Sequence, residues 1–145
     1  MRRYAMRKLL QVWLGLFGAS AVGIGLLHIA LGPSCIPGSI PVNATMDSED
    51  RFYGSIFVAY GVAVLWCVRE VEKKAEVVKF LAAAFFLGGL ARVVSWLAAG
   101  PPHAFFVAMI PVELVQPLLM VALANRVARA AGPLAIARPE LAPER

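Results

Sequence analysis

Charged residues are scarce in this sequence. They make up 16% of its 145 residues, whereas hydrophobic residues make up 60%. An ordinary soluble domain has about 25% charged and about 45–50% apolar residues. The shortage of charge therefore excludes an ordinary soluble fold, and the length and composition together predict a membrane protein the size of one domain.

Cysteine and histidine are scarce as well, with two of each. Cys35 follows the first long apolar segment and Cys67 lies near the end of the second. A membrane thickness of about 30 Å thus separates them and excludes a disulfide between the two. His28 and His103 are expected at one face, near a group of acidic residues, but their spacing matches no metal or haem ligand motif. We expect no metal and no other cofactor.

Motifs for covalent or phosphate chemistry are also missing, since the sequence shows no nucleophile motif, no pair of carboxylates and no phosphate-binding loop. The net charge is +5. The basic residues cluster beside apolar segments, which is how topology signals are distributed. We therefore expect no nucleic-acid partner.

Four long apolar segments are present instead. They cover residues 9–31, 52–68, 80–99 and 105–124. Each is close to the ~20 residues that a helix needs to cross ~30 Å of hydrocarbon. The runs are continuous and lack the alternation of a barrel strand. The sequence predicts an all-α bundle of four transmembrane helices, with one domain over residues 1–131 and a disordered tail over 132–145.

Lysine and arginine residues predict the orientation. Twelve of the fourteen fall before the first segment, between the second and third, or after the fourth: Arg2, Arg3, Arg7, Lys8, Arg69, Lys73, Lys74, Lys79, Arg126, Arg129, Arg138 and Arg145. Because basic flanks stay in the cytoplasm, both termini are predicted there, in a multi-pass protein of the inner (plasma) membrane. The outer connections are then residues 32–50 and the tight turn 100–104, which makes the last two helices a hairpin.

Two charged residues lie inside the apolar segments. Arg92 lies seven residues from the outer end of the third segment, and Glu113 lies eight residues from the start of the fourth. At 1.5 Å per residue, both are about 11 Å below the outer boundary. Arginine keeps its proton and needs a negative partner in hydrocarbon. We predict an ion pair between Arg92 and Glu113 across the hairpin.

Other polar groups are expected at the same depth: Ser20, Tyr60, Ser95, Trp96 and Gln116. Pro111 and Pro117 also free backbone carbonyls in the fourth segment. The layer predicts either a buried polar network or a ligand pocket that opens outward. The candidate ligand-binding residues are Arg92, Glu113, Tyr60, Gln116, Trp96 and Arg51.

Arg51 has two interpretations. It is expected at the start of the second helix, after the acidic residues Asp47, Glu49 and Asp50. The group either stabilises the helix end through capping and the helix dipole or forms the mouth of a pocket.

Small residues predict where helices approach closely. Gly15, Ala19 and Gly23 recur every four residues in the first segment. Ala84 and Gly88 have the same spacing in the third, and Gly54 and Gly61 are seven apart in the second. Such residues allow backbones to pack closely in membranes.

Three short motifs carry a resemblance to a known family. The first motif, Ser48-Glu49-Asp50-Arg51-Phe52-Tyr53-Gly54, precedes and opens the second segment. The second, Gly88-Gly89-Leu90-Ala91-Arg92, lies in the third segment, and Glu113 lies in the fourth. Over roughly residues 9–124 the chain resembles a bacterial membrane-protein family catalogued as a domain of unknown function. The resemblance implies a four-helix fold and no activity.

Three classes of function fit these observations. The favoured hypothesis is a non-catalytic protein that binds a lipid or small amphipathic ligand, or serves as an accessory subunit of a membrane complex. Its partners would be membrane lipids, another protein or a second copy of the chain. The alternatives are an intramembrane enzyme that uses Glu113 as acid or base on a lipidic substrate, and a transporter component.

Overall fold

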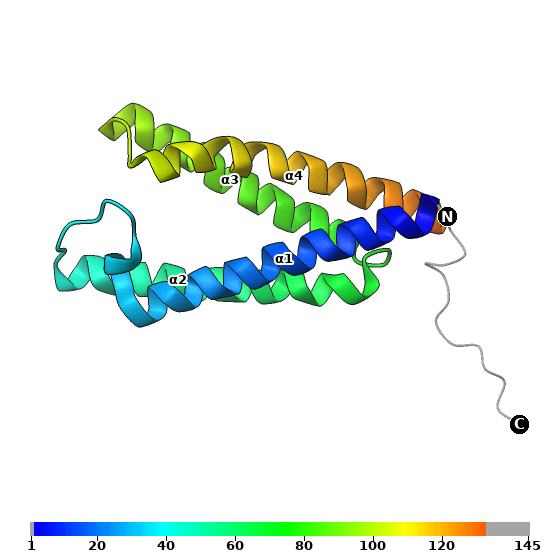
Figure 1. The fold of residues 1–145 in the computed structure, drawn as a ribbon, viewed down its shortest axis with the longest axis horizontal. Coiled ribbons are helices and arrows are strands. Elements are labelled where there is room, and N and C mark those ends of the chain that lie inside the picture. Colours follow the sequence, from blue (N-terminus) through cyan, green and yellow to red (C-terminus); the bar gives the residue numbers. More distant parts are fainter. Residues whose placement is uncertain (1, 133–145) are drawn as a thin grey trace, which may run out of the picture.

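The structure is a computed structural model and describes residues 2–132 (Figure 1). Its elements are α1 (Arg2–Leu31), η1 (Gly32–Cys35), α2 (Ala44–Cys67), η2 (Val68–Glu70), α3 (Ala75–Ala99) and α4 (Ala104–Ala131). All four α-helices are long and apolar enough to cross a membrane. The predicted four-helix, multi-pass membrane protein is thus confirmed. The predicted tail lies, beyond Gly132, outside the described residues.

Helix α2 begins eight residues before its apolar segment. The side-chain oxygen of Asn43 accepts a hydrogen bond from the backbone N–H of Met46 at 3.0 Å and caps the new start. The acidic residues and Arg51 therefore lie within the first two turns of α2. Their predicted place, in the outer connection and at the helix start, was wrong because the apolar run marks only the part of a helix that lies in hydrocarbon.

The four helices form two antiparallel hairpins, α1–α2 and α3–α4 (Figure 1). The hairpins lie close together where α1 begins and α4 ends, and their ribbons separate toward the opposite end. We call the close end, which carries Lys8, Lys74 and Arg126, the basic end. The opposite end, which carries Asp47 and Asp50, is the acidic end.

The hydrophobic core lies in the half of the bundle nearer the basic end. It contains Leu10, Leu14, Val64, Cys67, Val71, Ala75, Val78, Leu81, Ala82, Met120, Ala124 and Val127. An ion pair between Arg7 Nε and Glu72 Oε1, at 2.8 Å, adds a contact between α1 and the link before α3. At the acidic end, Gly38 of the first connection packs against His103 at the start of α4.

Glycine pairs bring α1 and α2 into backbone contact. A Cβ added to Gly25 would lie 2.6 Å from the carbonyl oxygen of Gly54, and one added to Gly61 would lie 2.7 Å from that of Gly18. The prediction for Gly54 and Gly61 is therefore confirmed. The prediction for α1 was wrong, because a Cβ added to Gly15 or Gly23 of its four-residue stripe would meet no atom of another element within 4 Å.

Candidate functional site

Arg92 and Glu113 meet inside the α3–α4 hairpin. Arg92 Nε donates a hydrogen bond to Glu113 Oε2 at 2.6 Å. The Glu113 side chain is 9% exposed and the Arg92 side chain 39%. The guanidinium carbon also lies 5.0 Å from the centre of the Phe106 ring, so a cation–π contact helps to hold it. The two side chains face each other as their matched depths predict.

Gly89 makes room for this pair. A Cβ at position 89 would lie 3.1 Å from Glu113 Cβ and 2.9 Å from a methyl carbon of Leu114, whereas one at Gly88 would meet nothing within 4 Å. The close-packed glycine of α3 is thus Gly89, and the predicted Gly88 was wrong. The ion pair and the glycine together fasten α3 to α4.

Tyr60 does not share the level of Arg92. Its hydroxyl donates a hydrogen bond to the carbonyl oxygen of Leu81 at 2.8 Å. Leu81 precedes Arg92 by eleven residues, which is about 16 Å along α3. Tyr60 packs there with Phe17 and Phe85, whose ring centres are 4.8 Å apart. A single polar layer was the wrong prediction, because depths counted from the first apolar residue of each segment do not mark one plane.

Arg51 holds the end of α1. Its Nε donates to Asp47 Oδ2 at 2.8 Å and its Nη2 to Asp47 Oδ1 at 3.1 Å. Its Nη1 donates to the carbonyl oxygen of Ile29, in the last turn of α1. Beside it, His28 Nδ1 lies 2.9 Å from Asp50 Oδ1. These contacts satisfy carbonyl oxygens at the C-terminal end of α1. The structural interpretation had placed this role at the N-terminus of the second helix, which Asn43 caps instead.

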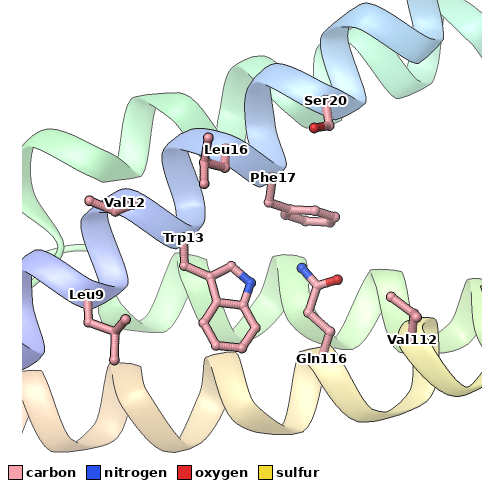
Figure 2. Close-up of a pocket in the computed structure, with 8 residues that line it drawn as sticks. All are labelled: Leu9, Val12, Trp13, Leu16, Phe17, Ser20, Val112 and Gln116. Carbon is pink, nitrogen blue, oxygen red and sulfur yellow. The ribbon is translucent and has the colours of Figure 1, made fainter.

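A groove runs between α1 and α4 (Figure 2). Its volume is about 530 Å³, and its lining residues are Leu9, Val12, Trp13, Leu16, Phe17, Ser20, Val112 and Gln116. Figure 2 shows the Gln116 side chain reaching from α4 toward α1, beside the indole of Trp13 and the ring of Phe17. Of the six candidate ligand-binding residues, Gln116 is the one that lines this groove; the exposed Trp96 and the other four lie elsewhere.

Three polar groups border this mostly apolar groove: the indole nitrogen of Trp13, the hydroxyl of Ser20 and the amide of Gln116 (Figure 2). Within residues 2–132 their side chains make one hydrogen bond, from Gln116 Nε2 to the sulfur of Met120 at 3.8 Å. A thioether is a weak acceptor. Because unsatisfied polar groups are costly in hydrocarbon, these side chains have hydrogen-bonding capacity to offer a ligand.

Sequence reasoning missed Trp13 and Phe17 as part of this site. The signal was present, since Trp13, Phe17 and Ser20 follow one another at spacings of four and three and therefore share a face of α1. In the described part of the chain, no three His, Cys, Asp or Glu side chains come together as a metal site.

Comparison with known proteins gives one family. The family described as "Domain of unknown function (DUF4345)" matches residues 9–124. This stretch includes every residue of the groove and the Arg92–Glu113 pair. No curated protein and no solved structure gives a significant match.

Proposed function

The chain belongs to the DUF4345 family, and we propose that it is a non-catalytic membrane protein that binds a membrane lipid in the α1–α4 groove. The observation that carries this proposal is the set of Trp13, Ser20 and Gln116 polar groups on an otherwise apolar groove. Ligand sites are mostly apolar hollows of ~300–1,000 Å³ with a few polar groups that fix orientation. The groove fits this description in volume and in lining.

The residues that line the groove suit an amphipathic lipid. Leu9, Val12, Leu16 and Val112 offer apolar contacts along the length of the groove. The Gln116 amide can donate to an ester or hydroxyl oxygen and can accept from a hydroxyl group. A lipid with an acyl chain and oxygen atoms near its headgroup would use both kinds of contact.

The enzyme alternative has less support. The Glu113 carboxylate already accepts a hydrogen bond from Arg92 between α3 and α4, and neither residue lines the groove. A general base must reach the proton that it removes. The transporter alternative lacks support as well, because side chains fill the core near the basic end.

We also propose that both termini face the cytoplasm, with the protein in the plasma membrane. The support is the distribution of charge: the basic clusters of the sequence fall at the end where α1 begins and α4 ends. Basic residues in short flanking segments are retained on the cytoplasmic side. The groove would then extend outward from the cytoplasmic end of α1.

Native mass spectrometry with bound lipids tests the groove. Val112→Trp would fill it, whereas Val115→Trp places the same ring on the same helix outside it; both valines are exposed in the structure. We expect lipid adducts to fall strongly in Val112→Trp and to persist in Val115→Trp. Gln116→Leu removes one or two hydrogen bonds worth about 1 kcal/mol each, so adducts should weaken by roughly five- to thirtyfold.

Equal lipid retention in Val112→Trp and Val115→Trp would contradict the groove proposal. If the extracted protein carries no lipid but co-purifies with another protein or with a second copy of itself, the accessory-subunit alternative would be favoured. The two results differ in mass, so one spectrum separates them.

A further inference from the structure

An acyl chain alone cannot explain binding in this groove. Lipid tails are as apolar as leucine, so a chain that moves from the bilayer to Leu9, Val12 and Leu16 gains little hydrophobic free energy. Selection of one lipid over another must therefore come from polar or charged contacts at the headgroup.

Four cations at the basic end, Arg7, Lys73, Lys74 and Lys79, are already paired. Arg7 pairs with Glu72, and Lys79 pairs with Glu76. Lys73 and Lys74 both pair with Glu70. Their charge is largely compensated by these carboxylates, which leaves them little to offer a second anion.

Lys8 and Arg126 differ from this group. Both are exposed and have no acidic partner within residues 2–132. Arg3, Arg69 and Arg129 share these two properties, so the distinguishing feature of Lys8 and Arg126 is their position beside the groove. Lys8 directly precedes the groove residue Leu9 and lies one turn before Val12. Arg126 follows Val112 by fourteen residues, close to four full turns, so it lies on the same side of α4. The two cations therefore flank the groove on its two helices at the basic end.

We propose that Lys8 and Arg126 bind the headgroup of an anionic lipid whose acyl chain occupies the groove. This inference rests on the proposed function and adds the headgroup class. Trp13 lies five residues, or about 7.5 Å, along α1 from Lys8, and the Gln116 side chain lies beside its indole (Figure 2), where ester oxygens next to the headgroup would reach both. The cations, the hydrogen-bonding groups and the apolar lining of the groove thus follow one another in the same order as the headgroup, the ester groups and the acyl chain of a phospholipid.

Competition between two lipids with identical acyl chains tests the headgroup. The protein in detergent micelles is mixed with phosphatidylglycerol and phosphatidylcholine, and adducts are counted by native mass spectrometry. We expect the wild type to prefer phosphatidylglycerol by up to about thirtyfold, since each of two basic residues near an anionic headgroup contributes about 1 kcal/mol. The preference should fall to within about twofold in Lys8→Gln/Arg126→Gln.

Arg69→Gln is the matched control. Arg69 is an exposed cation of the same end without an acidic partner among the described residues, but it belongs to η2, between α2 and α3. Its loss should leave the preference unchanged. An equal fall in Arg69→Gln and Lys8→Gln/Arg126→Gln would overturn the inference, since it would show a diffuse effect of charge.

The same experiment separates this inference from the proposed function. If Val112→Trp lowers both adducts but the wild type shows no preference, the groove binds lipid and the headgroup inference fails. If Val112→Trp lowers neither adduct, the groove proposal fails and the headgroup inference fails with it.

Discussion

At the residue scale, Arg92 and Glu113 show how a membrane helix hairpin tolerates two charges. A lone charge in hydrocarbon is costly, but a pair with a 2.6 Å hydrogen bond offsets each partner's desolvation. The contact of Arg92 with the Phe106 ring and the space left by Gly89 complete this arrangement. Removing either residue alone would therefore leave the other as an uncompensated charge in the membrane.

A double-mutant cycle measures this dependence. Arg92→Leu and Glu113→Leu alone should each lower the free energy of unfolding by about 3 kcal/mol, because each leaves a partner without compensation. The combined variant should lose less than the sum of the two by more than about 1 kcal/mol. Thermal unfolding in detergent micelles, followed by circular dichroism, gives the values. Additive losses would show that the two side chains do not depend on each other.

The sequence alone was enough to predict the Arg92–Glu113 pair, but it was not enough to predict the groove. Arg92 and Glu113 are the two charged residues inside the apolar segments, so a shared depth and a tight turn were enough to pair them. Trp13 and Phe17 look like ordinary lipid-facing aromatic residues in a sequence. They line a groove only because of the distance between α1 and α4, and a local sequence pattern carries no information about that distance.

At the scale of the element, the α1–α2 hairpin depends on a seven-residue repeat. Gly18 and Gly25 of α1 are seven residues apart, as are Gly54 and Gly61 of α2, and the antiparallel helices bring them together in two pairs. The equal spacing was readable in the sequence. The four-residue stripe of Gly15, Ala19 and Gly23 is the more familiar signal, but it lies on another face of α1.

Neighbouring glycines of α1 offer a matched test of this packing. Gly25→Ala should lower the free energy of unfolding by about 1–3 kcal/mol, because its Cβ would lie 2.6 Å from the carbonyl oxygen of Gly54. Gly23→Ala meets no atom within 4 Å and should be neutral or raise stability by up to ~1 kcal/mol, since alanine favours helix. Thermal unfolding of both variants gives the comparison. The same sign for both changes would refute close packing at Gly25.

The sequence predicted which helices exist and how they are joined better than it predicted the residues at which they begin and end. The apolar segments located all four helices, and the predicted tight turn over residues 100–104 correctly joined α3 to α4. The start of α2 was missed because its first two turns are polar. Asn43 was the available signal, since asparagine is among the best residues for capping a helix N-terminus.

At the scale of the whole molecule, the two hairpins divide the bundle into unlike halves. Near the basic end, side chains of all four helices and the α2–α3 link form a continuous core. Beyond Phe17, Tyr60 and Phe85 the hairpins separate, and much of α3 from Leu90 to Ala99 is exposed. Apolar composition predicts four spans, but it cannot predict this separation, because lipid and protein neighbours satisfy an apolar face equally well.

The orientation of these halves across the membrane is testable by labelling. Cys35→Ser removes the half-buried thiol of η1 and leaves Cys67, which is buried and serves as an internal negative control. Single cysteines are then placed at two exposed positions, Ser39→Cys in the acidic-end connection and Glu76→Cys in the first turn of α3. A membrane-impermeant maleimide is added to intact cells and to permeabilised cells.

With both termini in the cytoplasm, position 39 faces outward and should react in intact cells. Position 76 lies beside the basic cluster between α2 and α3 and should react after permeabilisation alone, because Arg69, Lys73 and Lys74 hold that link inside. The reverse pattern would invert the orientation and place the headgroup site of Lys8 and Arg126 on the outer leaflet. Labelling of both positions in intact cells would show that the twelve basic residues do not set a single orientation.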